Sequence, residues 1–283
     1  MKLFSARFDP DYPDLKQSLL LGVYYFGFGI IFYIAATIPV LFGKLIGWEF
    51  SLLTYLDYLR SIGGPVIVIP LIIFVSWKSG ISFNWELKSP GIRLILLLAL
   101  LAISVKIIEQ PLINSVEYLK ALIGGRVRQL YFSRPDFSFY MVLTSIFSVV
   151  ISPIIEEIFF RKQIFGILLK KYSPAVAIVL SSALFACAHF RIYDIGALFV
   201  SGLLYSFVYY KTKSLEASIL LHSLNNLSVG LMKYEYIDIA GMHFLKFMGV
   251  RVICGIIIYM IISYINGFGR IKADYQADET IAP

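Results

Sequence analysis

Three short patterns of polar residues lie in otherwise apolar stretches of this chain. Ionisable side chains are costly inside the hydrocarbon of a membrane, so their presence there asks for a functional explanation. Together the patterns supply two adjacent carboxylates, two imidazoles and an amide, which are groups able to activate water. We therefore predict an active site built inside a membrane. The patterns are Glu156-Glu157-x-x-x-Arg161, Phe185-x-x-x-His189 and His222-x-x-x-Asn226.

The first pattern follows the apolar run 137–155 and is expected near the end of that helix. Glu157 and Arg161 are four residues apart, which places them on one face of a helix and allows an ion pair. Glu156 points about 100° away from that face, because an α-helix turns by this angle per residue. We predict that Glu157 is held structurally while Glu156 titrates. The alternative is a solvated helix end with an ordinary ion pair.

The second pattern ends a predicted helix over residues 174–189. Phe185 lies one helical turn before His189 and is expected to pack the imidazole into one rotamer. Taken alone, a single histidine at a membrane boundary is more often an interfacial or hydrogen-bonded group than a catalytic one.

The third pattern lies inside an apolar helix, where leucines surround it. His222 and Asn226 are four residues apart and share one face. Asn225 is three residues from His222 and also reaches that face, so spacing alone leaves open which asparagine supplies the amide. The alternative interpretation is an interhelical hydrogen-bonded pair, which membrane helices use for packing.

The elements that position these residues are predicted to be membrane helices. The chain has 283 residues, of which 59% are hydrophobic and 15% are charged, and its mean hydropathy is +0.79. Soluble domains usually contain about 25% charged residues. A membrane span requires roughly 20 apolar residues. We predict an all-α, polytopic membrane protein with about eight transmembrane helices, on these apolar runs: 17–43, 61–77, 94–105, 137–155, 172–188, 195–210, 217–232 and 252–269.

The net charge of +7 does not indicate nucleic-acid binding, because no dense basic run exists and the basic residues lie between apolar segments. Lys and Arg are enriched in cytoplasmic loops. Their distribution favours an orientation with both termini in the cytoplasm. The polar start of the chain lacks the pattern of a cleaved signal peptide.

The largest interruption of the apolar pattern is the segment 114–136. Three apolar helices without polar patterns precede it, and every pattern described above follows it. We predict a single membrane domain with two functional parts, in which residues 1–136 form accessory helices with a connecting loop and residues 137–283 form the catalytic core.

In this order and on successive apolar helices, the three patterns resemble the CPBP family, often called Abi. This family groups type II CAAX prenyl endopeptidases with bacteriocin-processing and self-immunity proteins. The resemblance covers about residues 138–230. Each pattern alone is weakly specific, whereas the ordered set in a multi-span protein is strongly specific.

The resemblance implies an eight-helix bundle with a cavity that opens toward the cytosol, in the C-terminal helices. Glu156 would activate water together with His189. His222 and Asn226 would then hydrogen-bond the oxyanion of the tetrahedral intermediate. Glu157 and Arg161, with Phe185, would support the site. The implied activity is that of an intramembrane endopeptidase acting on a membrane-associated protein or peptide, prenylated or not.

The resemblance also implies a choice between metal-independent glutamate catalysis and zinc. The chain lacks an HExxH motif, and an amide is an uncommon zinc ligand, so we favour glutamate catalysis without a cofactor. If zinc is used, its ligands would be Glu156, His189 and His222. The alternative functions are a proton-coupled membrane carrier and a non-catalytic bacteriocin self-immunity or scaffold protein.

The expected partners are membrane lipid and the membrane-associated or lipidated substrate, and the expected location is a bacterial cytoplasmic membrane. The sequence leaves the oligomeric state and the substrate open.

Overall fold

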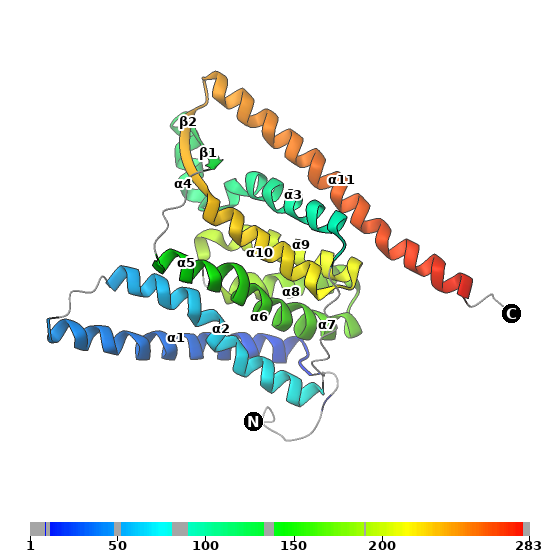
Figure 1. Cartoon of the computed structure of the whole chain (residues 1–283), viewed down its shortest axis with the longest axis horizontal. Coiled ribbons are helices and arrows are strands. Elements are labelled where there is room, and N and C mark those ends of the chain that lie inside the picture. Colours follow the sequence, from blue (N-terminus) through cyan, green and yellow to red (C-terminus); the bar gives the residue numbers. More distant parts are fainter. Residues whose placement is uncertain are drawn as a thin grey trace. The chain divides into compact units, whose positions relative to one another are not determined.

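Helices form most of the chain, in agreement with the predicted all-α class. The structure is a computed structural model that describes residues 9, 12–47, 52–80, 90–132, 139–189 and 191–279. The helices and strands are α1 (Leu15–Leu45), α2 (Leu52–Ser79), α3 (Ile92–Ile108), α4 (Ser115–Ile123), β1 (Arg126–Phe132), α5 (Phe139–Ile146), α6 (Ser152–Glu157), α7 (Gly166–Lys171), α8 (Pro174–Ala188), α9 (Ile195–Thr212), α10 (Leu215–Leu231), β2 (Met232–Asp238) and α11 (Met242–Glu279) (Figure 1).

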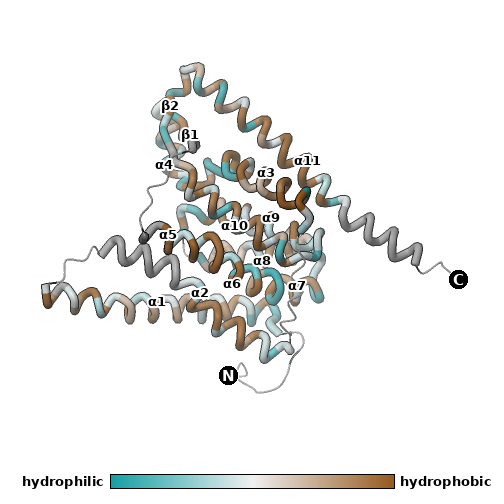
Figure 2. The backbone as a smooth tube through the Cα atoms, viewed as in Figure 1, coloured by the Kyte–Doolittle hydropathy of each residue, from teal (hydrophilic) through white to brown (hydrophobic). Residues whose placement is uncertain are grey.

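Several helices are long and apolar enough to cross a membrane. Figure 2 shows hydrophobic residues spread along α1 and along the coloured part of α11. The prediction of a membrane protein is confirmed, whereas the count of about eight spans is not. Within the described parts of the chain there are four candidate spans, at Leu15–Gly43, Val142–Lys171, Ile192–Thr212 and Met242–Gly267, and two shorter apolar helices, at Gly63–Ser79 and Pro174–Ala188.

The chain divides into two compact units, each assembled from two separate stretches of sequence. Unit 1 comprises Met1–Glu86 and Asp136–His189, and unit 2 comprises Leu87–Pro135 and Phe190–Pro283. Each unit therefore takes residues from both sides of the predicted boundary at residue 136. The predicted division into accessory and catalytic parts concerns function and stays a prediction.

Unit 1 contains one long helical stretch, from α5 to α7, that holds the first polar pattern. Two π-helical segments interrupt it, at Phe147–Ile151 and Ile158–Phe165, and the short helix α6 lies between them. Pro153 lacks a backbone N–H and its ring disturbs the preceding turn, which gives a physical reason for a wider turn at this point. Segments of this kind are frequent at functional sites.

This stretch corrects one detail of the sequence analysis. The run 137–155 was expected to end near Ile155, with Glu156 close to the end of the helix. The helical path instead continues to Lys171, as part of the candidate span Val142–Lys171. Charged residues do not end the helix here, because Glu157 and Arg161 neutralise each other inside the unit.

Unit 2 contains α3, α4, α9, α10 and α11, and a tight turn joins α9 to α10. Lys213 adopts a left-handed conformation, with a φ of 55°, and ends α9. Ser214 then caps α10, because its Oγ accepts a hydrogen bond of 3.1 Å from the backbone N–H of Ala217. Such a serine cap satisfies one of the free N–H groups at a helix start. The turn fixes where α10, which carries His222, begins.

A two-stranded antiparallel sheet in unit 2 was not predicted. Strands β1 and β2 pair from Arg126 opposite Asp238 to Phe132 opposite Met232. An ion pair of 3.7 Å joins Arg126 and Asp238 at one end of the sheet. The segment 114–136, which the sequence analysis treated as an interruption, therefore contains both α4 and β1.

Candidate active site

Glu156 and His189, which the sequence analysis assigned to one task, lie side by side in unit 1. Glu156 is on α6, and His189 directly follows the last residue of α8. The distance between Glu156 Oε2 and His189 Nε2 is 3.5 Å, and 14% of the Glu156 side chain and 24% of the His189 side chain are exposed. The structure thus brings a carboxylate and an imidazole together, and both side chains are partly exposed.

The backbone determines which nitrogen of His189 exchanges protons. His189 Nδ1 lies 2.8 Å from the carbonyl oxygen of Phe185. Because a carbonyl oxygen only accepts hydrogen bonds, Nδ1 must carry a hydrogen. Nε2 is then the nitrogen that gains or loses a proton next to Glu156. One proton can be held between the two side chains, which is the arrangement of a base that takes a proton from water and later returns it.

Phe185 holds the His189 ring in place. The two ring centroids are 4.6 Å apart, with 58° between the ring planes. Phe185 is itself buried and meets the ring of Phe160 edge-on at 5.3 Å. The predicted packing of Phe185 against His189 is confirmed, and the carbonyl contact described above adds a second restraint.

Glu157 and Arg161 form the predicted ion pair, at 3.1 Å between Glu157 Oε2 and Arg161 Nε, with both side chains fully buried. The Arg161 guanidinium also lies 4.6 Å from the centre of the Phe185 ring. A cation over an aromatic face is attracted by the ring's electron density. The pair therefore supports Phe185, which in turn restrains His189.

Gly64 on α2 was missed by the sequence analysis. A Cβ atom at this position would lie 4.0 Å from Glu156 Oε1 and 3.9 Å from the hydroxyl oxygen of Tyr25. The backbone of α2 therefore passes close to the Glu156 carboxylate, with no side chain in between. Small residues permit such close approach between membrane helices. The pair Gly63-Gly64 inside an apolar run was the signal that could have indicated it.

His222 is buried in unit 2, on α10, with 3% of its surface exposed. Its ring stacks on Tyr205 of α9, with centroids 4.6 Å apart and planes 21° apart. Asn226, one turn later on the same helix, is half-buried. The predicted placement of both residues on one apolar helix is confirmed.

The structure also bears on the choice between Asn225 and Asn226. Asn225 Nδ2 donates hydrogen bonds to the Tyr205 hydroxyl, at 2.5 Å, and to Ser201 Oγ, at 3.2 Å. An amide nitrogen has two hydrogens, so both donors of Asn225 are used in packing. This supports Asn226 as the amide of the proposed site.

The predicted site residues are thus found in two places. Glu156, Glu157, Arg161, Phe185 and His189 come together in unit 1. His222 and Asn226 lie in unit 2. That the two sets act at one place stays a prediction. The third histidine of the chain, His243, lies in the first turn of α11.

Comparisons with known proteins give an independent indication of the family. Residues 138–228 match the family described as type II CAAX prenyl endopeptidase Rce1-like. The chain is 31% identical over 148 residues to YdiL of Bacillus subtilis (strain 168), named as a candidate membrane peptidase, with 52% of this chain and 60% of that protein covered. It is 30% identical over 167 residues to the membrane-embedded CAAX protease MroQ of Staphylococcus aureus (strain USA300), with 55% and 65% covered.

The chain therefore spans less than two thirds of the length of these two relatives. No solved structure matches it. The matched segment contains all three polar patterns, and the resemblance inferred from those patterns is confirmed.

Proposed function

We propose, because residues 138–228 match the Rce1-like type II CAAX prenyl endopeptidases, that this chain is an intramembrane endopeptidase. It would hydrolyse a peptide bond of a membrane-associated protein or peptide, prenylated substrates included. The observation that carries the proposal is the pair of Glu156 and His189, with 3.5 Å between carboxylate oxygen and imidazole nitrogen. A base of this kind is what the activation of water requires.

In the proposed reaction, Glu156 and His189 take a proton from water while the water oxygen attacks the carbonyl carbon of the scissile bond. The negative charge that develops on the carbonyl oxygen is bound by N–H groups of His222 and Asn226. When the carbon–nitrogen bond breaks, the pair returns the proton to the leaving amine. Glu157 and Arg161 do not touch the reacting atoms and hold Phe185 and the helix around them.

Membrane lipid and a substrate anchored in it are the proposed partners. The names of the two relatives, a membrane peptidase and a CAAX protease, support a substrate of this class. Both relatives are bacterial proteins, which supports a bacterial cytoplasmic membrane as the location. We propose that both termini face the cytoplasm, where more of the basic residues between the apolar runs lie.

Metal-independent catalysis is the proposed mechanism, although the spacing of Glu156 and His189 also fits a shared metal ion. The 3.5 Å between Glu156 Oε2 and His189 Nε2 is short enough for both atoms to be ligands of one ion. In that version Glu156, His189 and His222 would hold zinc, which would supply a Lewis acid and an activated water. The described residues include no group of three His, Cys, Asp or Glu side chains placed to hold one ion, which favours the metal-independent version.

We expect the cleavage rate of the purified protein to stay unchanged after exhaustive chelation. The physical reason is that the carboxylate and the imidazole can move the proton without a metal. The measurement is the initial rate of peptide cleavage before and after dialysis against a chelator. A loss of activity that added zinc restores would contradict metal-independent catalysis and leave the peptidase assignment intact.

The peptidase assignment itself is tested with His189→Ala. We expect a fall in kcat of about 10²-fold, because the variant loses the group that shares the proton of Glu156. The assay is cleavage of matched farnesylated and unmodified peptides by the protein in proteoliposomes. His243→Ala is the matched control, because His243 is exposed at the start of α11. Equal rates for His189→Ala and the unchanged protein would overturn the proposed role of His189.

A further inference from the structure

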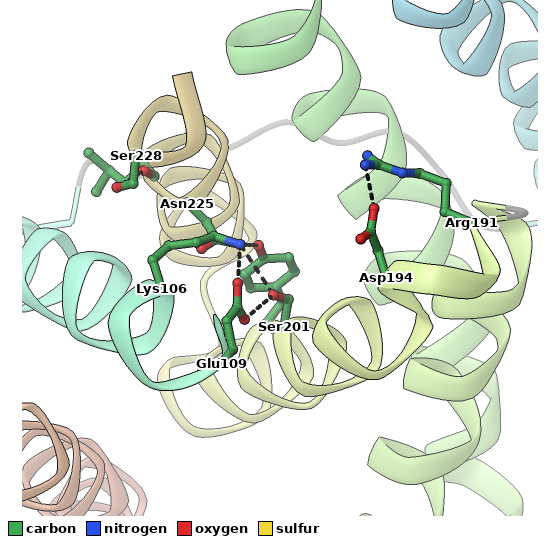
Figure 3. A network of polar contacts seen from close by, with 9 residues as sticks. Lys106, Glu109, Arg191, Asp194, Ser201, Asn225 and Ser228 are labelled. Carbon is green, nitrogen blue, oxygen red and sulfur yellow. Dashed lines mark hydrogen bonds and ion pairs between the residues drawn. The ribbon is translucent and has the colours of Figure 1, made fainter. Parts of the chain in front are cut away.

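A buried polar network in unit 2 has no part in the reaction described above. Figure 3 shows Lys106, Glu109, Ser201 and Asn225 pointing toward one another. They come from α3 and the residue that follows it, from α9 and from α10, and all of them are buried. Buried charges and amides inside apolar helices carry a desolvation cost, so the network is expected to have a task.

In this network the donors point toward the Glu109 carboxyl group, either directly or through Ser201. Lys106 Nζ donates to Glu109 Oε1. Ser201 Oγ donates to Glu109 Oε2, at 3.4 Å. Asn225 Nδ2 donates to Ser201 Oγ, at 3.2 Å. Ser201 has one hydroxyl hydrogen, which it donates to Glu109, so its lone pairs are left to accept from Asn225. The carboxylate thereby orients the Asn225 amide.

The oriented Asn225 amide reaches Tyr205. Asn225 Nδ2 donates to the Tyr205 hydroxyl at 2.5 Å. At the other end of the same residue, Ser218 Oγ donates to the backbone carbonyl oxygen of Tyr205, at 3.2 Å. These two hydrogen bonds restrain Tyr205 at its hydroxyl and at its backbone, and the residue is buried.

The restrained Tyr205 ring is the surface on which His222 lies. Ser218, His222 and Asn225 are spaced by four and three residues on α10, so they share one helix face. All three contact Tyr205, and His222 does so by stacking at 4.6 Å and 21°. An imidazole stacked on a restrained ring is held in one plane, which limits the directions in which its N–H groups can point.

We propose that Tyr205 and Asn225 are positioning residues that aim the His222 imidazole, anchored by the buried pair of Glu109 and Lys106. The role rests on the proposed function, in which His222 binds the oxyanion of the tetrahedral intermediate. Donors of this kind work only when they are aimed before the charge develops. The network therefore supplies the preorganisation, while His222 makes the contact with the reacting oxygen.

The first experiment observes the His222 ring directly and does not depend on activity. The chain contains three histidines, so histidine-selective isotope labelling gives three sets of imidazole signals, assigned by single substitutions. The stacked Tyr205 ring shields the ring protons of His222. In Tyr205→Leu we expect the His222 signals to move downfield and broaden, while those of His189 and His243 keep their positions.

The second experiment separates aiming from folding through kinetics. A displacement of a catalytic group, here the His222 imidazole, by about 1 Å lowers the reaction rate roughly 10²-fold. We expect Tyr205→Leu to lower kcat by about this factor with KM within about twofold, since substrate binding does not use Tyr205. Tyr205→Phe keeps the ring and loses only a hydrogen bond, so its kcat should fall about two- to tenfold. Tyr209→Leu, one turn along α9, is the matched control.

The outcomes distinguish the two proposals. Unchanged His222 signals in Tyr205→Leu would overturn the positioning role, whatever the activity. A shift of these signals in a protein that cleaves no peptide would uphold the stacking and contradict the proposed function. If Tyr205→Leu does not fold, Asn225→Ala provides the same test, because it leaves the ring and removes the hydrogen bond that orients it. Equal kcat in Asn225→Ala and the unchanged protein would then refute the proposal.

Discussion

Glu156→Gln is expected to reduce peptide cleavage by about 10² to 10⁴-fold while the protein accumulates normally in the membrane. Glutamine keeps the shape of the side chain and cannot accept a proton from water, so the variant loses general-base catalysis, which contributes a factor of this size. Because the carboxylate is partly exposed and lies beside His189 rather than inside a buried ion pair, its replacement should cost little stability. The measurement is kcat for a membrane-associated peptide in proteoliposomes.

Glu117→Gln is the control for Glu156→Gln. Glu117 is exposed on α4, and the same chemical change there should leave kcat unchanged.

The double variant Glu156→Gln with His222→Ala tests whether residues of the two units act in one reaction. Groups that act as one catalytic unit are strongly non-additive, so the double variant should be scarcely slower than Glu156→Gln alone. If the fold-reduction in kcat of the double variant equals the product of the fold-reductions of the two single variants, the residues work independently.

Glu157→Ala is expected to destabilise the protein by about 3–5 kcal/mol. Both side chains of the pair are fully buried, and the variant leaves the Arg161 guanidinium charged in an apolar interior, where breaking a buried pair costs about this much. The loss should spread to the site, because Arg161 lies over Phe185 and Phe185 packs on His189. Thermal or denaturant unfolding of the purified protein in detergent measures it.

The control for this prediction replaces both charges at once. The double variant Glu157→Leu with Arg161→Met removes the pair and fills its space with apolar atoms, which is often close to neutral for stability. We therefore expect it to be more stable than Glu157→Ala. A Glu157→Ala variant that unfolds like the unchanged protein would contradict the structural role of the pair.

Local chemistry explains why part of this site can be predicted from the sequence. The pairs Glu157 with Arg161, Phe185 with His189, and His222 with Asn226 are each four residues apart, and one helical turn brings such residues together wherever the helix lies. The helices themselves follow from long apolar runs, because a membrane span must satisfy its backbone hydrogen bonds internally. The membrane class, the family resemblance and the three local pairs were therefore predictable.

Contacts between helices were not predictable in this way. The approach of Glu156 to His189 depends on how α6 lies against α8, and that of Gly64 to Glu156 depends on α2. The helix continues past Glu157 because the ion pair is buried, which a reading of hydropathy along the chain cannot detect. The strands β1 and β2 pair residues far apart in the sequence.

The sequence by itself determined which side chains are available for the chemistry and which of them share a helix face. Only the tertiary structure decided their surroundings. It placed the His189 Nε2 toward the Glu156 carboxylate, engaged both hydrogens of Asn225 in packing, and stacked Tyr205 on His222. The physical reason is that spacing along one helix is set by its own hydrogen bonds, whereas the meeting of two helices is set by the packing of many side chains at once.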